Sequence, residues 1–295
     1  MLLSVIIPTC NRNELLEKCL KLLDSKNQTI NLNNYEVIIS DDSKKNVAKK
    51  LIEEKYKWAK WVEGFKKGPA ANRNNGAKHA RGEWFIFIDD DCLPDRHLLQ
   101  LYKSAIEKYR ETLAFEGCVL PNDWNLLKKD LAECPVNTNG NCFWSANICI
   151  KKSLFEEING FNEEYLIAAQ EDQQMKIDIE NATKKQIRFL KECIVIHPVR
   201  FPTLYAQLKR IPAASKNYSI YAVKNKNVLS YQTVWKFMEE QTKFHARSAF
   251  HCIKAGKIKS FIVSCMWLCY GVPLNVINFS RVSRKIDCSV QKGYL

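Results

Sequence analysis

Apolar runs and helical patterns alternate along the first part of the chain. Residues 2–9, LLSVIIPT, form an unbroken apolar run that Pro8 ends, as expected of a buried parallel strand. Residues 13–25 then repeat apolar side chains every three or four positions, which predicts a helix. Residues 35–43, YEVIISDDS, predict a second strand, and residues 44–57 predict an amphipathic helix.

The same alternation continues through the next fifty residues. Residues 70–82 predict a short helix closed by Gly82. Residues 84–88, WFIFI, predict a third strand, and residues 94–109 predict a helix with Pro94 near its start. Alternation of strands and helices predicts an α/β fold with a doubly wound, mostly parallel central sheet that helices flank.

Two of the predicted strands end in acidic residues. Asp41 and Asp42 end the second strand, and the third strand runs into Asp89, Asp90 and Asp91. Adjacent carboxylates repel one another, so the triple aspartate is either a solvated turn or a cation site. Ligands of doubly wound sheets bind outside the carboxyl ends of the strands. Both acidic clusters are therefore expected at one crevice, which favours the cation site.

The later part of the chain has a different pattern. Residues 112–199 are less regular, with strand-like runs at 115–120 and 191–198, and residues 233–257 predict a basic helix. Residues 260–280 are apolar enough for a membrane span, but Gly271, Pro273 and Asn275 interrupt them, so the sequence favours an in-plane membrane contact. The alternative is a buried C-terminal helical pair with a solvated basic rim.

Composition fits a large α/β domain with an appendage. The chain has 295 residues, of which 46% are hydrophobic, enough for a packed core. Its 12 cysteines include no CxxC pair, which argues against a zinc ribbon or a thioredoxin-like site. The short N-terminal apolar run lacks a basic flank and predicts a strand, not a secretory signal. A reduced, cytoplasmic chain is the simplest interpretation.

The positive charge is confined to the last third of the chain. The net charge is +13, yet residues 1–199 contain 29 Lys/Arg and 29 Asp/Glu. Residues 200–295 contain 16 Lys/Arg and three acidic residues, so they hold the whole excess. This asymmetry predicts an anionic partner, either membrane lipid or nucleic acid. Basic and aromatic residues alternate in residues 216–232 as in some single-strand binders, but no nucleic-acid module is recognisable, and nucleic acid is not expected.

Four motifs together resemble a known family. SVIIPTCNR (4–12), VIISDDS (37–43), GPAANRNNGAKHARGEWFIFIDDD (68–91) and the run from EEINGF to QEDQQ (156–174) resemble, in order and spacing, the motifs of glycosyltransferase family 2. The resemblance implies an inverting enzyme with a GT-A fold that takes sugars from nucleotide diphosphosugars. It covers about residues 2–200 and so implies a catalytic domain at 1–200 with a basic, partly apolar helical extension at 201–295.

The resemblance implies a divalent metal, Mn²⁺ or Mg²⁺, at the DXD-type element. It makes Asp91 a metal ligand and gives Asp89 a contact with the ribose or a metal-bound water. Asp90 either contacts the donor or supports these ligands. Hard carboxylate oxygens suit such ions, which neutralise charge on the departing diphosphate. Some family members have a third metal ligand at the position of His197, although a lone histidine is more often structural.

Further donor contacts are implied around the first two strands. Asp41 matches the residue that hydrogen-bonds the nucleobase, with Pro8, Thr9 and Arg12 forming the first loop around it. The alternative for the Asp41–Ser43 run is a helix N-cap, which fits Asp42 and Ser43 best. Arg73 matches an arginine that holds the base or the diphosphate; otherwise it is an ordinary surface arginine. A UDP-sugar is the default donor.

The resemblance also places a catalytic base and an acceptor pocket. Inverting transfer needs a base for the acceptor hydroxyl, and Asp172 matches it, with Glu171 as an orienting neighbour. The family often has glycines before this pair, whereas this chain has LIAAQED; the alternative is an acidic pair that starts a helix. Trp144 and Asn147 fall in the region that lines the sugar and acceptor pocket, with core packing as the alternative for Trp144.

These features predict a metal-dependent inverting glycosyltransferase. The C-terminal charge and residues 260–280 suggest a glycan or lipid-linked glycan acceptor in bacterial surface-polysaccharide synthesis, at the inner face of the cell membrane. A non-catalytic nucleotide-sugar-binding or nucleic-acid-binding scaffold is the alternative from another class. A sugar nucleotidyltransferase fits less well, because PTCNRNELL stands where that class has a Gly-rich basic loop.

Overall fold

The computed structural model describes residues 2–229 and 233–291, with side chains to residue 285, and divides the chain into two compact units. The first, the sheet unit, comprises residues up to 124 and residues 134–199. The second, the helical unit, comprises residues 125–133 and those from 200 onward. Nothing in the sequence predicts that residues 125–133 join the helical unit.

The sheet unit is built on a mixed sheet in the order β3-β2-β1-β4-β7-β6-β8-β5. Its strands are β1 (Leu3–Thr9), β2 (Tyr35–Asp41), β3 (Lys60–Glu63), β4 (Trp84–Phe87), β5 (Leu93–Pro94), β6 (Ala114–Pro121), β7 (Ile148–Lys151) and β8 (Arg188–His197). The first four pair in parallel, as predicted, and β6 pairs in parallel with β8. β7 runs antiparallel to both β4 and β6, so the second half of the sheet is mixed.

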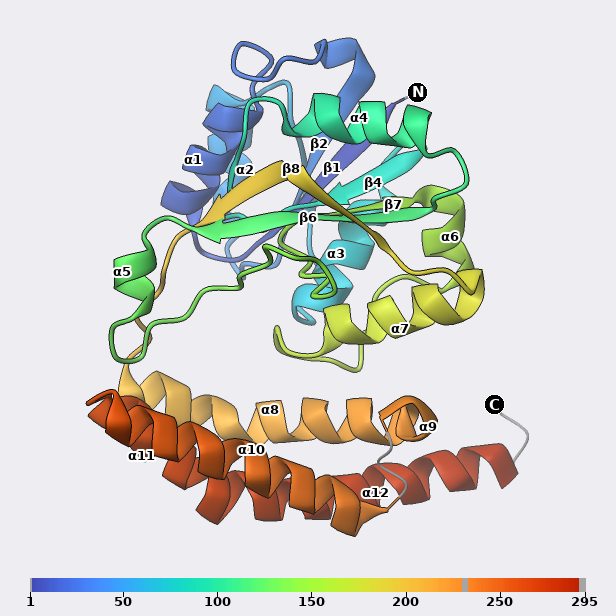
Figure 1. Ribbon diagram of the computed structural model, residues 1–295. Coiled ribbons are helices and arrows are strands. Elements are labelled where there is room, and N and C mark those ends of the chain that lie inside the picture. Colours follow the sequence, from blue (N-terminus) through green and yellow to red (C-terminus); the bar gives the residue numbers. More distant parts are fainter. Residues whose placement is uncertain (1, 230–232, 292–295) are drawn as a thin grey trace. The chain divides into compact units, whose positions relative to one another are not determined.

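Helices cover both faces of this sheet (Figure 1). On one face lie α1 (Asn13–Leu23), α2 (Val47–Lys55) and α4 (Leu98–Lys108). On the other lie α3 (Pro69–Lys78), α6 (Lys152–Glu157) and α7 (Glu171–Thr183). The short helices η1 (Leu32–Asn34) and α5 (Trp124–Leu127) lie in connections. The arrangement is the two-faced α/β layering that the alternating pattern predicts.

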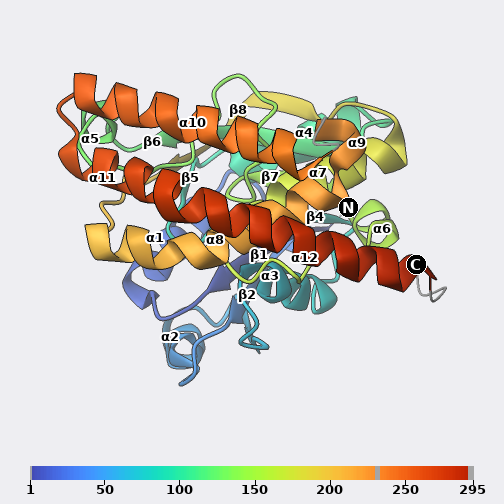
Figure 2. The same cartoon turned by 90° about the horizontal axis from the view of Figure 1, so that it is seen from below.

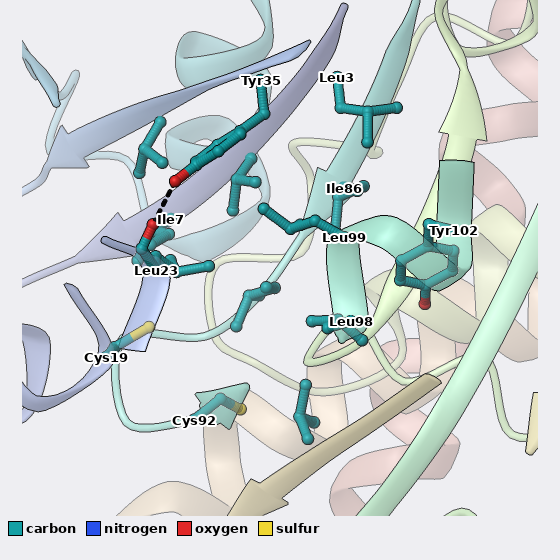
Figure 3. Close-up of a cluster of buried hydrophobic side chains, with 14 of the residues drawn as sticks. Leu3, Ile7, Cys19, Leu23, Tyr35, Ile86, Cys92, Leu98, Leu99 and Tyr102 are labelled. Atoms are coloured by element: carbon teal, nitrogen blue, oxygen red, sulfur yellow. Dashed lines mark hydrogen bonds between the residues drawn. The ribbon is translucent and has the colours of Figure 1, made fainter. Parts of the chain in front are cut away.

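The larger core lies between the sheet and the α1, α2 and α4 helices (Figure 3). This core includes Leu3 and Ile7 of β1 and Leu98, Leu99 and Tyr102 of α4, all of them fully buried. Burying such a side chain contributes about 1.5–3 kcal/mol. The hydroxyl of Tyr35 donates to the Leu23 carbonyl over 2.7 Å, which satisfies its polar end inside the core.

Two predicted helix boundaries are wrong. α3 ends at Lys78, and the amide of Gly82 instead donates to Ser4 Oγ over 2.8 Å. Pro94 is not in a helix, because it lies in the edge strand β5, a position that tolerates a residue without an N–H donor. α4 begins only at Leu98.

The helical unit consists of α8 (Leu204–Lys224), α9 (Lys226–Leu229), α10 (Val234–Lys254), α11 (Ile258–Met266), the π turn η2 (Trp267–Gly271) and α12 (Val272–Gln291). The predicted basic helix corresponds to α10. The expectation that Gly271 interrupts the apolar segment is wrong, because the helix continues through η2 from Ile258 to Lys285. Gly271 is required there, since a Cβ would lie 2.2 Å from the Trp267 ring. By length and composition alone, this helix could cross a membrane.

Three helices of this unit pack through a mixture of aromatic and small polar side chains. α10 lies alongside α11 and α12 (Figure 2). Phe237 of α10 stacks on Phe279 of α12 with ring centroids 5.3 Å apart. Ser248 of α10 is 3.0 Å from Ser264 of α11. The carboxylate of Asp130, from the 125–133 segment, accepts the Lys259 amide over 2.8 Å and so caps the start of α11.

Candidate active site

Acidic and basic side chains meet at the carboxyl edge of the sheet. Thr9 ends β1, the triple aspartate follows β4, and His197 ends β8. Glu171 begins α7, and its carboxylate lies 3.2 Å from Arg73 of α3. Strand ends and helix starts thus bring these side chains to one edge of the sheet.

Asp90 and Asp91 are buried and held by Arg12. The Arg12 guanidinium lies 2.8 Å from Asp90 Oδ1 and 3.0 Å from Asp91 Oδ2, and the Thr9 hydroxyl donates to Asp90 Oδ2 over 2.7 Å. Asp90 is 0% and Asp91 3% exposed, so the interpretation as a solvated turn is wrong. Burial raises the pKa of Asp90 to about 7, against the opposing effect of Arg12.

His197 completes a compact set of metal-compatible donors. Its Nε2 lies 3.2 Å from Asp91 Oδ1, and its Nδ1 is 2.9 Å from the Pro198 carbonyl, which fixes the ring orientation. One ligand atom each of Asp91, His197 and Cys92 falls within 4.8 Å of the others, and all three residues are buried. A carboxylate and an imidazole are ligands that fit Mn²⁺ or Mg²⁺, with the nitrogen favouring Mn²⁺.

Arg73 connects the triple aspartate to the acidic pair of α7. Its guanidinium lies 2.8 Å from Asp89 and 3.2 Å from Glu171, and it stacks over the Phe161 ring at 5.4 Å. Arg73 is 3% exposed, so it is not an ordinary surface arginine. A buried arginine between two carboxylates fixes the distance between the two halves of the site.

The NRNNG motif explains how α3 organises the loops around Arg73. Asn72 donates to the Thr9 and Ser40 carbonyls, and Asn74 donates to and accepts from the backbone of Phe161. These short amides satisfy loop backbone that would otherwise be buried without partners. At Gly76 a Cβ would lie 2.6 Å from Ile6, so glycine permits α3 to lie directly on β1.

Glu171 and Asp172 start α7 with their carboxylates buried. Asp172 is 8% exposed, and its Oδ2 lies 3.5 Å from the Ser145 amide. Burial, and then the neighbouring charge of Glu171, raises the pKa of Asp172 to about 8. Burial also raises the pKa of Glu171, and Arg73 opposes that shift. The preceding Gln170 has a φ of 75°, a left-handed conformation that glycine adopts more easily.

Asp41 has a different environment from the one that the family resemblance implies. It is fully buried, its Oδ1 accepts the Ser43 amide over 3.0 Å, and its Oδ2 accepts the Ala48 amide over 2.9 Å. The helix-capping role that the sequence assigns best to Asp42 and Ser43 is thus filled by Asp41 and by Ser43, whose Oγ accepts the Val47 amide over 2.9 Å. Asp42 instead accepts the Lys66 amide over 2.7 Å. These contacts argue for a structural role of Asp41 at the start of α2.

Asn147 and Trp144 also have well-defined structural contacts. Asn147 is 1% exposed; its amide donates to the Cys118 and Cys193 carbonyls and accepts from the Tyr102 hydroxyl. With donors and acceptor taken, Asn147 joins β6 to β8, which argues against a place in the acceptor pocket. The Trp144 indole donates to the Val136 carbonyl over 3.0 Å and packs on the main core, in line with the core-packing alternative.

Two further residues contribute to the site, and the sequence motifs do not identify them. Glu116 of β6 accepts the amides of Cys142 and Phe143 over 3.1 and 2.7 Å and thereby shapes the loop that faces α7. Its partners are some 25 residues away, so only a tertiary contact identifies it. Cys92 joins the donor set of Asp91 and His197. Its place directly after the triple aspartate is the one available clue.

Comparison with solved structures shows the fold. The structure of S. aureus TarS residues 1–349 in complex with UDP matches with a TM-score of 0.53 at 18% identity, over 99% of this chain and 92% of that one. The mannosyltransferase PcManGT from Pyrobaculum calidifontis, in complex with GDP-Man and Mn²⁺, also matches with 0.53, at 17% identity, over 99% of this chain and 76% of that one. These likenesses confirm the GT-A fold that the sequence predicts.

The sequence match agrees with the resemblance that the motifs carry. Residues 4–130, less than half of the chain, match the model of glycosyl transferase family 2. A Campylobacter jejuni GalNAc(5)-diNAcBac-PP-undecaprenol beta-1,3-glucosyltransferase is 33% identical over 134 residues, 43% of this chain and 41% of that protein. A Bacillus spizizenii poly(ribitol-phosphate) beta-glucosyltransferase is 33% identical over 113 residues, 36% of this chain and 18% of that protein. The chain thus spans less than half the length of these relatives.

Proposed function

We propose that this protein is a metal-dependent inverting glycosyltransferase that moves a sugar from a nucleotide diphosphosugar to a glycan or lipid-linked glycan. The observation that carries the proposal is the division of one site into two acidic groups. Asp91 and His197 form one group, Glu171 and Asp172 form the other, and Arg73 joins them through Asp89 and Glu171. A metal–diphosphate centre and a separate base are what a single displacement requires.

The first group is suited to hold the donor. Asp91 and His197 would hold the divalent ion, and Cys92 lies within reach of both. When bound, the ion neutralises charge that develops on the departing diphosphate. Arg12 borders a surface hollow that Asn11, Asn13 and Val47 also line, and we assign the nucleotide to this hollow. The same edge of the sheet also contains Pro8, Thr9, Asp89 and Asp90. Asp41 contributes indirectly, because it accepts an amide at the start of α2.

The second group is suited to accept a proton. A base must remove the proton of the acceptor hydroxyl as that oxygen attacks the anomeric carbon. Asp172 has a pKa raised to about 8, which makes it a stronger base than an ordinary carboxylate once it is ionised. Glu171, held by Arg73, orients the start of α7. Loss of the Asp172 proton to solvent precedes each turnover.

The acceptor and the location follow from the relatives and the helical unit. The C. jejuni relative is named for a polyprenyl-diphosphate-linked glycan and the B. spizizenii relative for a ribitol-phosphate polymer. We propose an acceptor of the lipid-linked kind, reached at the cytoplasmic face of the membrane, where the +13 charge of residues 200–295 meets anionic lipid. A UDP-sugar is the proposed donor.

Donor hydrolysis tests the enzyme assignment against a binding protein. The full chain is incubated with a panel of UDP- and GDP-sugars and Mn²⁺, and release of the nucleoside diphosphate is measured with and without EDTA. We expect slow release with one donor, abolished by EDTA and restored by Mn²⁺. Tight donor binding in thermal shift assays without any release, with or without added glycan acceptors, would favour the non-catalytic alternative.

A further inference from the structure

The helical unit presents large apolar side chains outward. Along α11, η2 and α12, the exposed residues include an apolar row, here called the stripe: Ile258, Ile262, Met266, Tyr270 and Ile277. Their exposed fractions are 70%, 38%, 37%, 45% and 45% in that order. The first four follow one another at intervals of four residues, and residues that far apart in a helix lie on one side of it. Residues 260–280 contain no charged side chain, so no charge interrupts the stripe from Ile262 onward.

The interior of the same unit is unusually polar. Several small or amide side chains are buried between its helices, namely Ser215, Ser219, Gln241, Ser264 and Asn275. The Ser219 hydroxyl donates to the Asn275 carbonyl over 3.2 Å, and Asn278 donates to Ser215 Oγ over 3.1 Å. The interior also has an apolar cluster around Phe237 and Phe279, but buried polar residues together with large apolar residues outside depart from the usual distribution in water. Small polar helix contacts are typical of helices that face lipid on another side.

Charges at both ends of the stripe indicate the chemistry of its partner. Lys257 and Lys259 flank its first residue, Ile258, and Arg281, Arg284 and Lys285 follow its last one. Four of these five residues are exposed, and Lys257 is half-buried. The uncharged interval covers about 30 Å of helix at 1.5 Å per residue. Basic residues near an anionic leaflet contribute about 1 kcal/mol each.

The packing of α10 decides between a spanning and an in-plane arrangement. Phe237 and Ser248 of α10 contact Phe279 and Ser264, so the part of α10 between them lies beside the middle of the apolar helix. That part carries Glu239, Glu240, Lys243 and Arg247. If the apolar helix crossed the membrane, these charges would be carried into the hydrocarbon, at about 2.5–3.5 kcal/mol each. An in-plane position avoids this cost.

We infer that the stripe inserts in the plane of an anionic lipid leaflet, with the basic residues at its two ends at the lipid phosphates. This inference rests on the membrane association proposed above and assigns it to one face of α11, η2 and α12. The apolar side chains enter the acyl boundary, while α10 keeps its charges in the headgroup region. The partner is the bilayer surface, and a second copy of the chain on the stripe is the alternative that the experiment decides.

Vesicle binding of the full chain tests this inference. The protein, purified without detergent, is sedimented with phosphatidylcholine vesicles that contain or lack phosphatidylglycerol. We expect reversible binding to the anionic vesicles that added salt weakens. The double variant Ile258→Glu/Ile262→Glu should bind about tenfold more weakly or worse, since each lost apolar contact is worth more than 1 kcal/mol. The double variant Tyr205→Glu/Val228→Glu removes exposed apolar residues of α8 and α9 with the same charge change and should bind like the unaltered protein.

Several outcomes would overturn the inference. Equal binding of the stripe variant and the control variant would remove the stripe as the contact, and equal binding to both kinds of vesicle would remove the charge recognition. A dimer in light scattering that the stripe variant alone dissociates would assign the stripe to a second copy. Donor binding and thermal unfolding of each variant are measured in parallel without vesicles. Because these readouts do not involve the stripe, failure of the proposed enzyme function is distinguishable from failure of the membrane contact.

Discussion

At the scale of single residues, the properties of the site follow from which charged side chains the fold buries. Arg73 could be an ordinary helix arginine by its neighbours in the sequence, yet it lies 2.8 Å from Asp89 and 3.2 Å from Glu171 in a water-poor setting. Asp172 carries a raised pKa for the same reason, since desolvation disfavours its charged form. The chemistry therefore follows from where α3 and α7 place these residues.

The raised pKa of Asp172 predicts a pH dependence of stability. Because the folded pKa lies near 8 and the unfolded one near 4, the folded state holds the proton more tightly between those values. The cost of burying this carboxylate therefore grows as the pH rises from about 4 to about 8 and is constant above. Asp172→Asn should unfold at a higher temperature than the unaltered ligand-free protein at pH 8, with a smaller difference at pH 5. A difference that is larger at pH 5 would contradict the assignment of the buried charge.

His197 predicts a second residue-scale result, in metal binding. His197→Gln removes the imidazole donor beside Asp91, and we expect Mn²⁺ affinity in the presence of UDP to fall by about tenfold or more. Calorimetric titration with Mn²⁺ measures this directly. His97→Gln changes an exposed histidine and is the matched control. Unaltered Mn²⁺ affinity in His197→Gln would leave the histidine with a structural role.

The sequence identifies residues that recur at regular spacing or that end a strand. It does not identify residues whose role depends on contacts with distant parts of the chain. Asp89–Asp91 are visible because they follow an apolar run, and His197 because it ends another. The role of Glu116 depends on the amides of Cys142 and Phe143, which no local pattern connects to it. The sequence favours Asp42 over Asp41 as a cap of α2, and only the fold shows that Asp41 accepts an amide of that helix.

At the scale of elements, the start of α7 carries an unusual strain. Gln170 has a φ of 75°, where an L-residue costs about 1–2 kcal/mol more than glycine. Gln170→Gly should stabilise the protein by about 0.5–1 kcal/mol, net of the added flexibility of the unfolded chain. Chemical denaturation measures it, and a loss above about 1 kcal/mol would show that the Gln170 side chain makes a stabilising contact.

The cap of α11 gives a second element-scale prediction. Asp130 accepts the amides of Lys259 and Ser260, which are otherwise without intrahelical partners at a helix start. Asp130→Ala should lower the free energy of unfolding by about 1–2 kcal/mol. Lys129→Ala, at an exposed neighbouring position, should change it by less than about 0.5 kcal/mol. Equal effects of the two variants in denaturant titrations would contradict the capping role.

Element boundaries show where local patterns stop being informative. The apolar periodicity predicts α1, α2 and α10 because each buries one side of an amphipathic helix. A glycine at position 271 suggests a helix break, but the helix continues through it. Glycine fits there because the Trp267 ring occupies the space that a side chain would need. The membership of residues 125–133 in the helical unit rests on the Asp130 cap, which spans 130 positions in the sequence.

At the scale of the whole molecule, two units divide the work. The sheet unit contains nearly all of the residues that match glycosyl transferase family 2 and the joined acidic groups at its carboxyl edge. The helical unit contains nearly all residues from 200 onward, in which the excess charge of 13 is found. The sequence indicates this division through its charge distribution. It does not indicate the stripe, because exposure of Ile258 or Tyr270 depends on how three helices pack.

The central claim is that Asp172 is the base of a metal-dependent transfer, and one comparison of variants tests it most directly. Single-turnover transfer and donor affinity are measured with Mn²⁺ for the unaltered protein, for Asp172→Asn and for Glu180→Gln, a change of a half-buried carboxylate on the same helix. We expect Asp172→Asn to bind the donor normally but to transfer about a hundredfold or more slowly, and Glu180→Gln to behave like the unaltered protein. Transfer by Asp172→Asn at the rate of the unaltered protein would contradict the account.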